Sequence, residues 1–159
     1  MYREGMDEPA WLDEHELSAW QAFLATGAII NRLVEQQLKD DSGLSHSQYE
    51  VLVRLADAPD GELRMTELAG AAFTSKSGLT YQVAQLEKAG LVRRRACPTD
   101  VRGVIASLTD EGWAVLRAAA PGHAALVREL FVSGLSREEF AGFAAGLSAL
   151  LGRLSVHAG

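Results

Sequence analysis

The side chains of this sequence that could do chemistry gather between Met65 and Thr109, where hydroxyl, amide and guanidinium groups recur at short intervals. Hydroxyls and amides hydrogen-bond to base edges and phosphate oxygens, while lysine and arginine pair with phosphates and with guanine. This combination of groups predicts binding to a nucleic acid. The candidate contact residues are Ser75, Lys76, Ser77, Thr80, Tyr81, Gln85, Lys88, Arg94, Asp100 and Arg102.

A helix over residues 75–88 would present most of these groups on one side. Leu79, Val83 and Leu86 follow the i, i+4, i+7 spacing of a buried helical face, so the polar residues between them must face outwards. The start of the helix also favours a phosphate, because its first backbone N–H groups have no partners within the helix. Taken alone, the same pattern fits an ordinary amphipathic surface helix equally well.

Residues 91–108 predict a β-hairpin after this helix. Pro98 breaks the outgoing strand, and Gly103 is expected to permit the sharp turn at the tip. Arg102 would then reach into a minor groove, whose narrow form attracts cations. We expect Asp100, two residues earlier, to hold the Arg102 guanidinium in place.

A motif at this hairpin runs from Asp100 to Thr109 and reads D-V-R-G, four further residues, then L-T. It resembles the D-x-R-(G/A)-x4-L-T signature of the MarR family of bacterial transcription regulators, and the segments before it match the same family in order. The resemblance implies a winged helix-turn-helix that binds double-stranded DNA, with residues 75–88 as the recognition helix and residues 91–108 as the wing. One position departs from the family, because Tyr81-Gln82 stands where many relatives have an arginine. No relative's operator sequence can therefore be transferred.

The rest of the chain is predicted to be helical, which gives a mainly α fold with a small β-hairpin: a winged helix-turn-helix with N- and C-terminal dimerisation helices. Leu63 predicts a brief strand that closes against the wing, and Pro121 predicts a kink or a break near residues 118–120. The alternative to an intertwined dimer is a monomer whose terminal helices fold back as a bundle. The predicted units are a flexible arm (1–10), a first dimerisation helix (11–43), a DNA-binding lobe (44–108) and C-terminal dimerisation helices (109–159).

The net charge of −6 is unfavourable for a DNA-binding protein, but the charge is not spread evenly. Residues 1–62 hold 4 Lys+Arg against 13 Asp+Glu, whereas residues 63–117 hold 8 against 5 and residues 118–159 hold 3 against 3. The positive charge therefore concentrates in the predicted helix and wing, which is sufficient for local attraction to phosphates. For residues 93–95, the alternative is a charged edge strand that prevents aggregation.

Several other classes of function have no signal in the sequence. No catalytic motif is present, so we expect neither an enzyme nor a cofactor. One cysteine and four scattered histidines offer no metal-ligand spacing. No apolar run is long enough to span a bilayer and the acidic start is not a signal peptide, so we expect a cytoplasmic protein without a membrane partner. His123 is expected to be a core histidine bonded to a carbonyl or carboxylate, the alternative being a pH switch.

These observations predict a homodimeric transcription regulator, most simply a repressor, that binds an inverted-repeat operator. The family resemblance implies a small aromatic or lipophilic effector, which would act by changing the spacing of the two recognition helices. Trp20, Phe23 and Tyr49 are candidates to line its pocket, with core packing as the alternative. Two other functions stay open: an oxidant sensor acting through Cys97, and a winged helix that contacts proteins instead of DNA.

Overall fold

The computed structural model describes residues 11–71 and 76–157, so the arm expected at residues 1–10 lies outside the described residues. The described chain has a 3₁₀ turn at Pro59–Gly61 and a π-helix at Arg128–Val132. Its strands are β1 (Glu62–Arg64), β2 (Val92–Cys97) and β3 (Asp100–Leu108). Its α-helices are α1 (Glu14–Ser42), α2 (His46–Asp57), α3 (Met65–Ala71), α4 (Lys76–Lys88), α5 (Asp110–Val127) and α6 (Arg137–His157).

Local capping signals set where the first two helices begin and end. The Asp13 carboxylate accepts a bond from the backbone N–H of Glu16, and the Glu16 side chain accepts one from Asp13, both at 2.8 Å. Gly43 ends α1 in the left-handed conformation with φ 72°. Ser45 and Gln48 form a reciprocal capping box at the start of α2. These bonds satisfy backbone groups that the helix itself leaves without partners.

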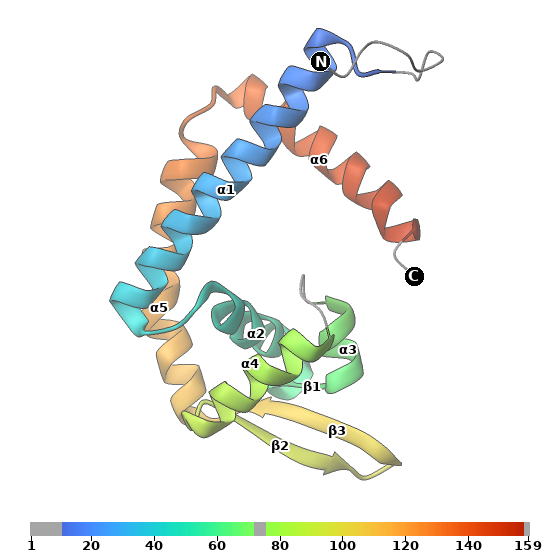
Figure 1. Ribbon diagram of the computed structural model, residues 1–159. Helices are drawn as coiled ribbons and strands as arrows, with labels where there is room; N and C mark the ends of the chain where they lie inside the picture. Colours follow the sequence, from blue (N-terminus) through green and yellow to red (C-terminus); the bar gives the residue numbers. More distant parts are fainter. Residues whose placement is uncertain (1–10, 72–75, 158–159) are drawn as a thin grey trace, which may run out of the picture.

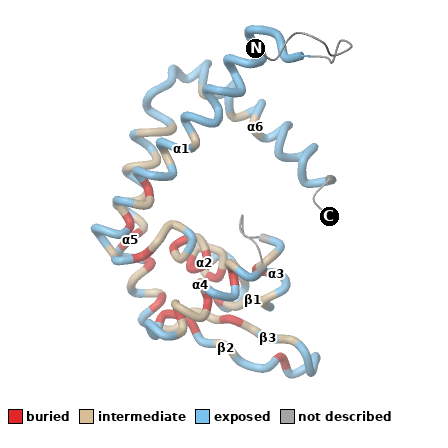
Figure 2. Tube along the Cα trace, viewed as in Figure 1, coloured by how far each residue is buried: buried red, intermediate tan, exposed pale blue. Residues whose placement is uncertain are grey.

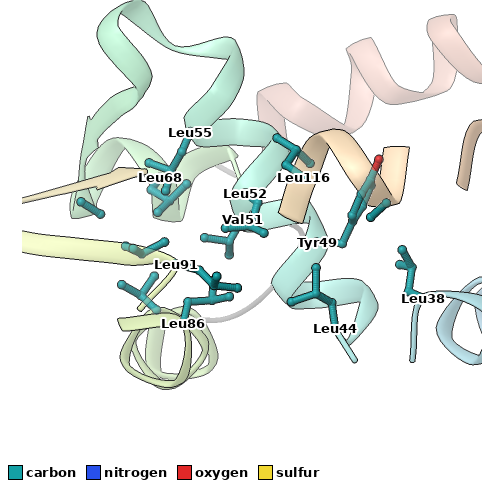
Figure 3. Close-up of a cluster of buried hydrophobic side chains, with 14 of the residues drawn as sticks. Leu38, Leu44, Tyr49, Val51, Leu52, Leu55, Leu68, Leu86, Leu91 and Leu116 are labelled. Carbon is teal, nitrogen blue, oxygen red and sulfur yellow. The ribbon is translucent and has the colours of Figure 1, made fainter. Parts of the chain in front are cut away.

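The hydrophobic core lies in a lobe formed by α2, α3, α4 and the sheet. The C-terminal part of α1 and the N-terminal half of α5 pack against this lobe. Figure 2 shows that the buried segments concentrate there, and Figure 3 shows leucines from these elements pointing toward one another. Leu79, Val83 and Leu86 are at most 1% exposed, so the apolar stripe predicted for α4 is confirmed. Leu52 and Leu68 face it from α2 and α3 and are fully buried.

The wing is a three-stranded antiparallel sheet in the order β1-β3-β2. The predicted hairpin is β2 and β3, in which Val92 lies opposite Leu108. The brief strand predicted at Leu63 is also present, and Leu63 pairs with Ala106 of β3. The sheet is connected to both helices of the helix-turn-helix, α3 and α4, because β1 directly precedes α3 and β2 follows α4.

The remaining helices, α1, α5 and α6, extend away from the lobe and together are called the helical arm. Figure 1 shows α5 running beside α1 and α6 turning away from both. The break predicted near residues 118–120 is absent: α5 continues through Pro121, because one missing backbone bond is tolerated in a helix that packs along α1. The irregularity comes later, at the π-helix Arg128–Val132. Among the described residues no helix has the length and apolarity to cross a lipid bilayer.

Candidate nucleic-acid interface

The polar face predicted for α4 is turned outwards. Ser77, Thr80, Tyr81 and Lys88 are all exposed, with Tyr81 at 61%, while Gln85 is half-buried beside them. The helix begins at Lys76, and Ser75 lies outside the described residues. Hydroxyl, phenol and amide groups are therefore displayed together on the surface opposite the buried stripe.

A tight connection joins the end of α4 to β2. Gly90 adopts φ 78°, a conformation that few other residues tolerate, and the N–H of Leu91 donates to the carbonyl of Leu86 at 3.0 Å. The Thr109 hydroxyl donates to the carbonyl of Gly90 at 2.7 Å and accepts from the N–H of Gly112 at 3.0 Å. The same threonine thus caps α5 and fixes the base of the wing.

The tip of the wing differs from the expected sharp turn at Gly103. Ala96 lies opposite Val104 and Cys97 opposite Asp100, so residues 101–103 loop out of the ladder. Gly103 is needed for close approach instead, because a Cβ there would lie 2.8 Å from the Cβ of Cys97. The outgoing strand β2 ends directly before Pro98, as predicted, but the chain reverses at residues 98–99 and not at Gly103.

Asp100 holds the tip through the backbone. Its carboxylate accepts a bond from the N–H of Arg102 at 3.0 Å, an Asx-type turn that fixes the looped-out residues. The predicted contact with the Arg102 guanidinium is wrong, since no ion pair joins these two side chains in the described part of the chain. Arg102 and its neighbour Val101, which is fully exposed, therefore project from a braced backbone.

Arg94 is half-buried, and its side chain contacts the protein through Glu87. Its guanidinium donates to Glu87 of α4 through Nε at 3.2 Å and Nη2 at 2.9 Å, and its backbone N–H donates to the same carboxylate at 2.9 Å. These bonds, from the guanidinium first and then from the backbone, hold the pKa of Glu87 below its usual range. Two of the five guanidinium N–H groups of Arg94 that were predicted to be available for DNA are thus directed to Glu87.

A hollow of about 380 Å³ lies between the wing and the two helices of the helix-turn-helix. It brings together Thr80 of α4 and Arg94, Asp100 and Arg102 of the wing, four of the residues that the sequence nominates for DNA contact. Two further polar side chains border it that were not predicted from the sequence. They are Arg64, which donates to the Thr99 hydroxyl at 3.1 Å, and Thr66. The signal for them was the position of β1, which directs Arg64 toward the returning strand.

The three residues predicted to line an effector pocket do not come together at one site. Tyr49 is buried at the junction of lobe and arm, with its ring 4.5 Å from that of His123. Trp20 and Phe23 lie on the arm, each 51% exposed and stacked at 5.9 Å. Phe23, without the other two, borders an apolar groove of about 380 Å³ between α1, the π-helix and α6.

His123 does not have the hydrogen bond expected of a core histidine. Its Nδ1 is buried without a hydrogen-bond partner among the described residues, and its ring lies 6.1 Å from that of His46. Burial, followed by the nearby His46, lowers the pKa of His123, and Glu50 acts in the opposite direction. Burial at the junction of α2 and α5 therefore disfavours the charged form of this histidine.

Cys97 is a buried residue at the end of β2. Its sulfur lies 3.4 Å from the Thr99 hydroxyl, and this hydrogen bond is the main cause that lowers the pKa of the thiol. Within the described ranges, no group of three or more His, Cys, Asp or Glu side chains is placed to hold a metal ion.

Comparison with known proteins agrees with this geometry. Residues 42–103 match the profile of the MarR family. The chain is also 36% identical over 114 residues to the HTH-type transcriptional repressor YetL of Bacillus subtilis, an alignment that covers 72% of this chain and 68% of YetL. The chain belongs to the MarR family. It is a winged helix-turn-helix transcription regulator and not an enzyme, so these predictions are confirmed.

Solved structures of the MarR family share the whole architecture. Sco3205, a MarR family regulator from Streptomyces coelicolor whose crystal structure is a complex with DNA, is 40% identical, with a TM-score of 0.86 over 92% of this chain and 91% of that one. AbsC from the same organism is 35% identical, with a TM-score of 0.86 over 92% of this chain and 98% of its own. The predicted fold class, winged lobe and helical arm together, is confirmed.

Proposed function

We propose that this MarR regulator works as a homodimer that represses transcription from an inverted-repeat operator. Each α4 would enter a major groove with Ser77, Thr80, Tyr81 and Gln85, and each wing would send Arg102 into the adjacent minor groove. The observation that carries the proposal is the exposed polar face of α4 beside the braced wing tip. Support comes from the relationship to Sco3205, whose structure is a complex with DNA.

The arm supports a second copy as the partner. On α6, Leu150, Leu151 and Leu154 are 46%, 55% and 54% exposed. On α1, Trp20 and Phe23 are about as exposed, and an apolar groove lies between the two helices. Large apolar side chains left exposed on both helices are typical of an interface. A two-fold dimer would place its two recognition helices about one helical turn, ~34 Å, apart on the DNA.

Repression and effector release are the finer parts of the proposal. The repressor YetL supports the direction of control. A small aromatic or lipophilic effector would act by altering the distance between the two lobes. The same proposal places the protein in the cytoplasm, with the chromosome that it regulates.

The test is fluorescence anisotropy on DNA from upstream of the protein's own gene, against a scrambled duplex of equal length, at several salt concentrations. We expect an operator dissociation constant on the order of 10 nM, well below that of the scrambled duplex. Affinity should fall steeply with salt, because each phosphate contact contributes about −0.9 to the slope of log K against log salt. If this duplex fails, operators are selected from a random-sequence library, and the absence of any selected sequence would overturn the proposal.

A further inference from the structure

Two arginines of β2 are each held by a carboxylate, but the two pairs join different parts of the lobe. Arg95 donates through Nη2 to both oxygens of Glu62, at 2.9 and 3.0 Å, and so ties β2 to the sheet edge at β1. Arg94 instead binds Glu87, which lies on the recognition helix α4. The Glu87–Arg94 pair is thus a direct polar link between the recognition helix and the wing.

This link extends beyond what the fold itself requires. The Gly90 turn and the buried Leu86, Leu91 and Val92 already attach the beginning of β2 to α4. Arg94 lies two residues further along the strand, opposite Ala106, where the wing begins to leave the core. Three hydrogen bonds to one partly exposed carboxylate at this point fix the direction of the strand more than they add stability, since exposed ion pairs contribute little.

The position of Arg94 connects the link to the tip of the wing. Arg94 borders the hollow whose other walls include Thr80 of α4 and the tip residues Asp100 and Arg102. A change in the angle of β2 against α4 would therefore move Arg102 relative to the groups on α4. DNA binding needs both sets of contacts at once, so their spacing must match that of the two grooves.

We propose that Glu87 and Arg94 form a clamp that sets the reach of the wing relative to the recognition helix, making both of them positioning residues for operator binding. This inference rests on the proposed function, because it concerns how the same DNA site is held in shape. It also gives a role to Glu87, a carboxylate that lies among the cations of the DNA-binding lobe.

Simple electrostatics gives the opposite expectation, which makes the clamp testable. Loss of the Glu87 charge would remove repulsion toward phosphates and release the Arg94 guanidinium. On that ground alone, Glu87→Gln should bind every duplex more tightly. The clamp predicts tighter binding to scrambled DNA but weaker binding to the operator. The ratio of the two affinities therefore separates the two explanations.

The experiment measures operator and scrambled affinities of the full-length protein by anisotropy, for the wild type, Glu87→Gln and the matched control Glu62→Gln. Both variants remove one carboxylate charge that is paired with an arginine of β2. We expect Glu87→Gln to lower the operator-to-scrambled ratio about tenfold, a coupling of ~1.4 kcal/mol, with an unchanged melting temperature. Glu62→Gln should leave the ratio within about twofold, because rim charges act mainly through the shared electrostatic term.

Two further variants test the positional role. In the Glu87→Gln background, Arg102→Ala should cost less operator affinity than in the wild type, since the wing tip is already misplaced. The exchange Glu87→Arg with Arg94→Glu should recover part of the lost ratio. An undiminished ratio in Glu87→Gln, or an Arg102→Ala effect that is fully additive, would overturn the clamp. If the wild type itself selects no sequence from the library, the proposed function fails first, and that failure is recognised without any variant.

Discussion

The lobe and the arm of this regulator bury their apolar side chains to different extents. In the lobe, leucines of α2, α3 and α4 are buried within one chain, and Leu52, Leu55 and Leu68 are completely inaccessible. On the arm, apolar residues of similar size remain about half exposed, and no described residue of α6 is buried (Figure 2). The single chain therefore completes its DNA-binding unit but not its arm.

This difference teaches that stability and assembly are separate properties here. The core of the lobe is formed from one chain, so its folding free energy should respond to single core substitutions. In the proposed homodimer the exposed apolar side chains of the arm would be buried against the second copy, so the order of the arm should depend on protein concentration by mass action. Tyr49 and His123 lie at the junction between the lobe and the arm. Each of the following predictions acts on one side of this boundary.

The largest effect is expected for Leu52→Ala in the lobe. Leu52 is fully buried, so the substitution removes packed atoms and leaves a cavity that costs about 2–5 kcal/mol of the free energy of unfolding. Urea denaturation at one fixed protein concentration measures it. A cost below about 1 kcal/mol would show that the lobe core is looser than its burial indicates.

Next in size is Leu151→Glu on the arm, where the leucine is 55% exposed in the single chain. A carboxylate at a dimer interface would be buried without a partner, so we expect dissociation of the dimer, a loss of about 2 kcal/mol or more of association free energy. Sedimentation velocity reports the mass. Val101→Glu introduces the same charge at a fully exposed residue of the wing and should leave the dimer intact. Equal masses for the two variants would remove the arm from the interface.

Arg102→Ala should affect only the function of the lobe. Loss of the cation at the braced tip is expected to weaken operator binding by about 1–3 kcal/mol while the dimer mass stays unchanged. Arg95→Ala is the matched control, because it removes an arginine already paired with Glu62. An unaltered operator affinity for Arg102→Ala would exclude the wing from recognition.

The smallest effect concerns the junction and depends on pH. Burial lowers the pKa of His123, so below its ordinary value of about 6.5 the unfolded chain binds this proton more readily than the folded one. Stability should therefore be intact above that pH and fall as the pH decreases toward the folded pKa. His123→Phe should flatten the decline between pH 7 and 5.5, whereas His15→Phe, on the exposed side of α1, should not. Urea midpoints across this range measure the difference, and parallel curves for all three proteins would refute it.

Much of the site could be predicted from sequence because its signals are local. The stripe of Leu79, Val83 and Leu86 depends only on helical periodicity, and the Ser45–Gln48 cap only on residues three apart. The strand–Pro98–strand pattern likewise located the hairpin. The roles assigned to individual bases and phosphates remain predictions, since they depend on a DNA partner.

The sequence by itself therefore determined the order of the elements, the buried face of α4 and the place of the wing. Tertiary structure alone decided which groups meet: Arg94 with Glu87 across the Gly90 turn, and Asp100 with the backbone of Arg102. It also separated Tyr49 from Trp20 and carried α5 through Pro121. The physical reason is that periodicity and capping act over a few residues of one chain, whereas the partner of a charged side chain depends on how strands and helices are packed.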